Sequence, residues 1–206
     1  MARGLHEKYT ELYPYLQNQT GLNITSLFHL FRLYDVLFCE SMWGLTLPEW
    51  TKSVFPHFLK QGSIENFMLF NGNPELIQLA GGFHLKKIII DMYNSLEKSQ
   101  PRMYLYSAHD MNVVSLLYAL NVFFPHLPPY AACVIIELHK INNIPFVKIY
   151  YEDHTLKNDI KQLVVGNCTA ECPLEKFVDL LKNNIPDTSN GDPCILNEDY
   201  LYPIIA

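Results

Sequence analysis

The chain has 206 residues, of which 49% are hydrophobic and 17% are charged, and its net charge is −6. This composition is typical of a folded globular chain and argues against disorder. The negative charge argues against a nucleic-acid partner, because such a protein needs a basic face to neutralise phosphates. No apolar stretch approaches the ~20 residues that span a bilayer, and residues 1–15 lack the apolar region of a signal peptide. The five cysteines are an odd number, which predicts at least one without a partner in the chain.

The first part of the chain predicts a mainly helical segment. Apolar side chains recur at helical spacing over residues 26–38, with Ser26 as the N-cap. A proline-containing turn at residues 47–50 leads into a further helix. We expect residues 1–75 to form a helical cap or subdomain and residues 76–206 to form part of an α/β domain.

A long helix is predicted over residues 75–96. Its core-facing side chains are expected to be Leu76, Leu79, Phe83, Ile89, Met92 and Leu96. Gly81 and Gly82 lie inside this helix and lower its helix propensity. The pair therefore indicates a close approach to another backbone, a ligand at this point, or a kink.

A possible site follows Pro101, where the pattern changes to strand and helix in alternation. Residues 102–107 predict a short buried strand and residues 113–122 a helix, with His109 and Asp110 between them. Ligands of open α/β sheets bind beyond the carboxyl ends of strands, and anions favour helix N-termini. A His beside an Asp supplies a cationic donor and a proton carrier, which suits phosphoryl chemistry. The alternative is an Asp helix cap beside a partly exposed His.

The last part of the chain predicts a hairpin and a helix. Residues 133–138 and 146–151 are rich in β-branched and aromatic side chains, and Asn142-Asn143 forms the turn between them. A final helix is predicted to begin at Pro173.

Cysteines and glycosylation sequons point to an oxidising compartment. Cys168 and Cys172 can close a small disulfide loop, with free thiols or a pair of metal ligands as the alternatives. A zinc site needs about four ligands, and no second close Cys or His pair is present. Asn-x-Thr sequons occur at Asn18, Asn23 and Asn167.

Several stretches, in the right order, resemble the histidine acid phosphatase family, most closely its prostatic and lysosomal type. Tyr-Leu-Tyr-Ser-Ala-His-Asp at 104–110 resembles the second catalytic motif of the family, and residues 127–133 resemble the segment after it. Residues 34–41 and 47–50 are similar to an earlier signature, and residues 166–174 to a late one. The resemblance implies an α/β fold, the C-terminal part of the histidine-phosphatase fold: a mixed sheet flanked by helices, with a helical subdomain.

The resemblance also implies a reaction and residue roles. The family hydrolyses phosphate monoesters at acid pH through a phosphohistidine intermediate, without metal or other cofactor. His109 would bind the phosphate, and Asp110 would donate a proton to the leaving group, for which it must itself be protonated. The nucleophilic His of the family lies in an Arg-His-Gly motif, which does not occur in this sequence. Met111-Asn112 stands where the family has hydroxyl residues, so a slightly different helix start is expected.

These departures predict the C-terminal portion of a longer protein, either a truncated product or an incomplete gene model, inactive alone. The full-length protein is expected to be secreted or lysosomal, to act on small phosphomonoesters, and to be a possible homodimer, with no nucleic-acid partner and no membrane span in this chain. One alternative is a non-catalytic pseudophosphatase or binding protein that keeps the anion pocket. Another is a relative of the inositol-phosphate phosphatases, which share the His-Asp motif but fit the cysteine pattern less well.

The resemblance assigns the cysteines as well. It implies disulfides between Cys39 and Cys133 and between Cys168 and Cys172. Cys194 would then be unpaired here, because the corresponding cysteine of the family pairs with one upstream of the region covered. The odd cysteine count therefore agrees with the expected absence of an N-terminal part.

Overall fold

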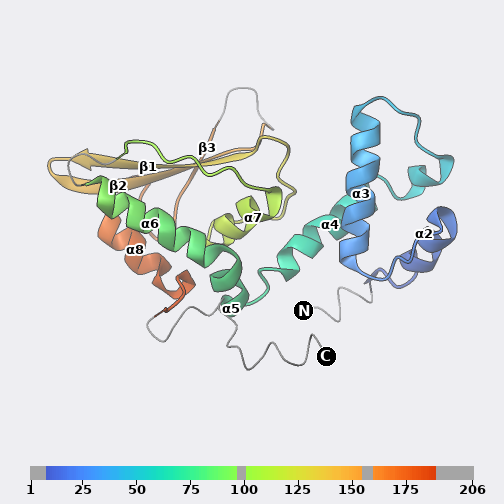
Figure 1. Cartoon of the computed structure of the whole chain (residues 1–206), viewed down its shortest axis with the longest axis horizontal. Helices are drawn as coiled ribbons and strands as arrows, with labels where there is room; N and C mark the ends of the chain where they lie inside the picture. The colour runs from blue at the N-terminus through green and yellow to red at the C-terminus, as the bar shows by residue number, and fades with distance from the viewer. Residues whose placement is uncertain (1–7, 97–100, 155–159, 189–206) are drawn as a thin grey trace, which may run out of the picture. The chain divides into compact units, whose positions relative to one another are not determined.

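A computed structural model describes residues 8–96, 101–154 and 160–188 (Figure 1). The chain divides into two compact units. The first takes in the described residues up to Gly72 together with Phe124–Tyr130, and the second takes in Asn73–Phe123 and the described residues from Ala131 onward. Each unit has a hydrophobic core of its own.

The first unit is helical. Its elements are α2 (Leu12–Thr20), α3 (Leu27–Met42), the 3₁₀ turn η1 (Glu49–Ser53) and α4 (His57–Leu69). Ser26 is the N-cap residue of α3, as predicted, and its backbone is extended. The stripe of apolar residues predicted for this helix is buried at Leu27, Leu30 and Tyr34, and α3 packs against α4.

The second unit joins helices to an antiparallel sheet. Its elements are α5 (Pro74–Ile77), the π-helical turn η2 (Gln78–Gly82), α6 (Phe83–Ser95), α7 (Asp110–Ala119), β1 (Cys133–Ile141), β2 (Ile144–Glu152), β3 (Lys161–Leu163), β4 (Cys172–Pro173), α8 (Leu174–Leu181) and the 3₁₀ turn η3 (Lys182–Asn184). Strand β2 pairs with β1 along one side and with β3 and β4 along the other. Figure 1 shows α6 and α8 on the same side of this sheet, and their apolar side chains share one core with those of α7 and β2. The predicted class, an α/β fold with a sheet flanked by helices, is confirmed.

The hairpin of β1 and β2 is also confirmed, and its register follows from its turn. Asn142 and Asn143 have positive φ values of 50° and 65°, and Asn tolerates this conformation better than most residues. The two-residue loop sets Ile141 opposite Ile144, and the pairing runs on to Cys133 opposite Glu152.

The long helix predicted over 75–96 is interrupted by η2, and part of its predicted core face is wrong. Ile89 and Met92 are buried as expected, but Leu76, Leu79 and Leu96 are exposed. The buried set of α6 is instead Leu85, Ile88, Ile89 and Met92. A π turn inserts one extra residue into a helix. A prediction that continues the 3.6-residue period through η2 therefore assigns the later residues to the wrong face of the helix.

Residues 102–107 do not form the predicted buried strand. Met103 is 77% exposed and Leu105 is 84% exposed, and this stretch belongs to no helix or strand. A strand is defined by its ladder partner, and no strand among residues 8–96, 101–154 and 160–188 pairs with it. The apolar run is present, but the side chains that would bury it are not supplied by the described residues.

Candidate active site

The His-Asp pair predicted from the sequence lies at the beginning of α7. His109 is the N-cap residue, with an extended backbone (φ −102°, ψ 167°), and Asp110 is the first helical residue. The Oδ1 atom of Asp110 accepts a hydrogen bond from the N–H of Met111 at 2.7 Å. The side-chain oxygen of Asn112 accepts one from the N–H of His109 at 3.1 Å. Asp110 is thus not the helix cap that the alternative expects, because His109 holds the N-cap position, but its carboxylate binds a first-turn amide, where negative charge is stabilising.

A hollow of about 570 Å³ lies in front of this helix end. Its lining residues are His84, Leu105, Tyr106, Ser107, Ala108, His109 and Asn112. His109 and Asp110 are both exposed, so the imidazole can reach a ligand in the hollow. The first-turn amides of a helix attract anions. The hollow therefore combines a helix N-terminus with an imidazole donor, whereas Asp110, the next residue after His109, is not among its lining residues.

A second imidazole, that of His84 on α6, lines the same hollow, although the sequence showed only scattered histidines. The ring of His84 meets the ring of Tyr106 edge-on, with centroids 4.9 Å apart. Its buried Nε2 atom has no hydrogen-bond partner among the described residues, and burial lowers the pKa of His84. The helical spacing of His84, Lys87 and Asp91 places all three on one side of α6, a signal that was available in the sequence.

The position of α7 is set by close backbone contacts at the glycine pair. A Cβ atom at Gly81 would lie 2.1 Å from the carbonyl oxygen of Ser115 on α7, and one at Gly82 would lie 2.2 Å from that of Asn184. The side chain of Asn184 also donates a hydrogen bond to the carbonyl oxygen of Ala119 at 2.8 Å. The sequence left three readings of this pair open, and the structure selects the close approach to another backbone.

One of the two predicted disulfides is present in the structure, and the other is not formed there. Cys168 and Cys172 form a disulfide in the structure, and Cys172 is buried in the core of the second unit. Cys39 and Cys133 are free thiols in the structure and belong to different units, so their pairing stays a prediction. Cys194 lies outside the described residues.

The three predicted sequons have exposed asparagines in both units. Asn18 lies in α2, Asn23 in the loop before α3, and Asn167 next to the disulfide. Within the described ranges, no group of three or more His, Cys, Asp or Glu side chains is placed to hold a metal ion. No helix in the same ranges has both the length and the apolar character needed to cross a membrane.

Comparison with known protein families supports the fold, and the matched region includes the beginning of α7. A sequence model of the histidine phosphatase superfamily (branch 2) matches residues 7–152. The chain belongs to this superfamily, whose match includes the His109-Asp110 pair.

The curated relatives that match the chain include several proteins named acid phosphatases. The chain is 35% identical over 190 residues to venom acid phosphatase Acph-1 of Apis mellifera, covering 89% of this chain and 49% of that protein. It is 36% identical over 185 residues to the prostatic acid phosphatase of Rattus norvegicus, covering 87% and 48%. It is 35% identical over 178 residues to the lysosomal acid phosphatase of the same species, covering 82% and 41%. The chain thus spans about half the length of these relatives, or less.

Proposed function

We propose that this chain carries the phosphate-binding and proton-donating half of an acid phosphatase site. The observation that supports this most directly is the beginning of α7, where His109 lines a hollow and Asp110 is the next residue along the chain. In this proposal, the protonated imidazole of His109 and the first-turn amides of α7 bind the phosphate oxygens. The protonated carboxyl of Asp110 donates to the leaving oxygen of the ester.

The nucleophile of the family has no counterpart in the sequence, since no Arg-His-Gly occurs among the 206 residues. We therefore propose that these residues bind phosphate monoesters but do not turn them over alone, because the covalent step needs a nucleophile. Other segments of a longer protein would supply the nucleophile and the arginines that clamp the phosphate. Phosphate binding without turnover is also what the pseudophosphatase alternative expects.

Two measurements on this chain test the proposal. The first is inorganic phosphate binding at about pH 5, with His109→Ala as the variant and His57→Ala, an exposed residue of the other unit, as the control. We expect His109→Ala to abolish binding and His57→Ala to leave it unchanged. Equal binding by the wild type and His109→Ala would contradict the assignment of the site.

The second measurement is hydrolysis of a chromogenic aryl phosphate at the same pH, with and without a chelator. We expect no turnover above the rate without protein. Robust turnover that survives the chelator would contradict the proposal that the nucleophile is missing, while leaving the site itself in place. A panel of aryl and inositol phosphates distinguishes the two phosphatase readings if turnover is found.

We further propose that the full-length protein is a secreted or lysosomal glycoprotein. Supporting observations are the Cys168–Cys172 disulfide and a relative named a lysosomal acid phosphatase. The sequons at Asn18, Asn23 and Asn167 have exposed asparagines. Expression through a secretory pathway and treatment with a glycosidase should release one glycan mass for each occupied sequon. Light scattering of the full-length protein tests whether it is a homodimer.

A further inference from the structure

An ion pair between the buried carboxylate of Asp91 and the exposed Lys87 lies on the side of α6 next to the candidate site. Asp91 is only 6% exposed, and Nζ of Lys87, one helical turn earlier, lies 2.5 and 2.6 Å from its two carboxylate oxygens. The hydroxyl of Tyr106 donates a further hydrogen bond to Oδ2 of Asp91. These donors compensate the cost of burying a carboxylate, which is large when the charge is unpaired.

This cluster contacts the segment that leads directly into the site. Residues 103–109 belong to no helix or strand, yet Tyr106 stands only three residues before His109. The ammonium group of Lys87 lies 5.7 Å from the ring centroid of Tyr104. Alternate residues of an extended chain point to the same side, so Tyr104 and Tyr106 can both face α6. Leu105 between them is 84% exposed.

Helix α7 and the turn before it are held by separate contacts. The close approach of Gly81 to Ser115 fixes the middle of α7, whereas the side chain of Tyr106 ties the preceding segment to α6 through Asp91. Loss of the Tyr106 hydroxyl would therefore leave α7 in place but make residues 107–109, which determine the position of the His109 side chain, more mobile. The Tyr106 hydroxyl therefore affects the geometry of the site more than the stability of the fold.

We propose that Asp91 is a positioning residue of the phosphate site, and that it holds residues 107–110 in a binding-competent conformation through its hydrogen bond with Tyr106. This inference rests on the proposed function. Lys87 keeps Asp91 ionised, because its hydrogen bonds, with that of Tyr106, lower the pKa of Asp91. The groups around the carboxylate are Lys87 and Tyr106, with His84 against the Tyr106 ring and Tyr104 beside Lys87. The lowered pKa of Asp91 keeps this anchor charged to a lower pH than an unpaired Asp would be.

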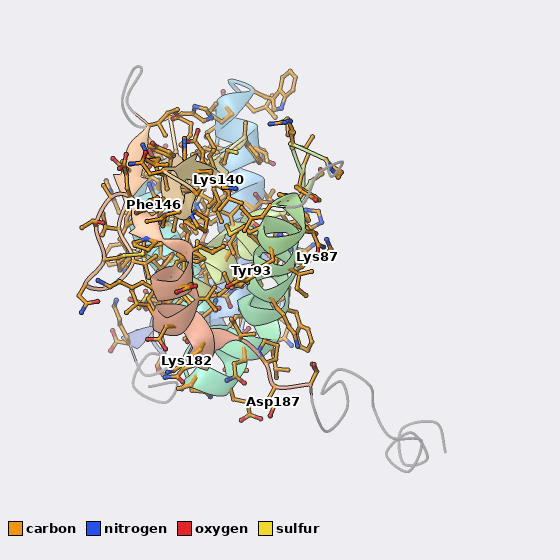
Figure 2. The ribbon with its side chains drawn as sticks, turned by 90° about the vertical axis from the view of Figure 1, so that its left-hand side faces the viewer. Lys87, Tyr93, Lys140, Phe146, Lys182 and Asp187 are labelled. Carbon is orange, nitrogen blue, oxygen red and sulfur yellow. A yellow bond between two sulfur atoms is a disulfide. The ribbon has the colours of Figure 1, made fainter. Side chains whose placement is uncertain are left out.

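The test compares Tyr106→Phe, Asp91→Asn and their double variant with a matched control, all in the full 206-residue chain. The control is Tyr93→Phe, which removes the hydroxyl of an exposed tyrosine on the same helix. Figure 2 labels both Lys87 and Tyr93 on α6. Tyr106→Phe keeps the ring that meets His84 and removes only the hydroxyl. Two quantities are measured: the affinity for inorganic phosphate, and hydrogen exchange of the peptide covering residues 107–112.

We expect Tyr106→Phe to weaken phosphate binding about tenfold and to speed exchange of residues 107–112. Two other quantities should match those of the Tyr93→Phe control. They are the hydrogen exchange of the part of α7 around Ser115 and the urea midpoint of the second unit. The double variant should lose no more affinity than the weaker-binding of the two single variants, because both changes act on the same Tyr106–Asp91 contact.

The failure of this proposal is separable from that of the proposed function. If His109→Ala abolishes phosphate binding while Tyr106→Phe binds and exchanges like the wild type, the positioning role is overturned. It is also overturned if affinity falls only in proportion to a general loss of stability. If the wild type binds no phosphate, the proposed function fails, and the positioning role, which rests on it, is overturned as well.

Discussion

The backbone of Gly81 in η2 and the carbonyl group of Ser115 in α7 are in direct contact, at a distance that leaves no room for a side chain. A Cβ atom at Gly81 would lie 2.1 Å from the Ser115 oxygen and 3.1 Å from the Cβ of Ala119. Both obstacles lie on one helix, and the nearer is backbone, which cannot rotate away. The glycine thus determines how closely α7, and with it the His109-Asp110 turn, approaches the helix that carries Asp91.

Replacement of Gly81 by alanine should therefore destabilise the second unit by about 3 kcal/mol or more, because a buried clash with backbone is relieved only by moving a helix. The measurement is urea unfolding followed by circular dichroism, with hydrogen exchange of α7 peptides to identify the unit affected.

The matched control is Gly62→Ala in α4. A Cβ atom there would meet the end of the Leu30 side chain at 2.8 Å, which can shift, and the alanine gains about 1 kcal/mol of helix propensity. The control should stay within about 1 kcal/mol of the wild type. Equal effects of the two substitutions would contradict the role given to Gly81.

A buried carboxylate, that of Glu65, predicts that the first unit loses stability in acid. Oε1 of Glu65 accepts hydrogen bonds from Lys8 at 2.6 Å and from Gln61 at 2.9 Å. Burial alone would raise the pKa of Glu65, but these hydrogen bonds outweigh it and lower the pKa below its usual value. A lowered pKa in the folded state contributes stability that is present above the unfolded-state pKa and is lost as the pH falls through the folded-state pKa.

Glu65→Gln should thus cost about 1–2 kcal/mol near neutral pH and show a smaller further loss at acid pH than the wild type. Unfolding can be followed by tryptophan fluorescence, since Trp43 and Trp50 both lie in the first unit. Glu11→Gln changes an exposed carboxylate of the same unit and serves as the control. A wild-type pH profile in Glu65→Gln would rule out this origin of acid sensitivity.

The Cys168–Cys172 disulfide closes a short loop, with three residues between the paired cysteines. Loop-closure entropy for so small a loop is worth about 2 kcal/mol. The double variant Cys168→Ala/Cys172→Ala should lower the free energy of unfolding of the second unit by about that amount. A larger loss would indicate that the buried Cys172 sulfur also contributes through packing.

The pairing of Cys39 with Cys133 is tested directly by peptide mapping under non-reducing conditions. We expect a cross-linked peptide that contains both residues in protein from an oxidising compartment. In the structure the Cys39 thiol is partly buried and lies 3.1 Å from the hydroxyl of Tyr130, whereas Cys133 is exposed. Alkylation of both thiols without prior reduction would contradict the pairing.

Local patterns predicted the hairpin well, because a two-residue Asn-Asn turn and the strands on either side specify each other within one stretch of chain. The position of the His-Asp pair at a helix N-terminus was predictable for the same reason. The core face of α6 was not, since the π turn that rotates it depends on packing of Gly81 against a distant helix. The contact of Tyr106 with Asp91 also required the fold, because tyrosines in an apolar run indicate burial and give no partner.

The extra residue in η2 also constrains the length of the chain at this point. Deletion of one residue would turn the π turn into an α turn and rotate the two halves of the helix by about 100° relative to each other. Gly81 could then no longer face Ser115 while Lys87 and Asp91 face Tyr106. Substitutions at an exposed position such as Ala80 are compatible with the site, whereas a single insertion or deletion nearby is not. A relative that is one residue shorter or longer between positions 78 and 82 should accordingly have an altered site.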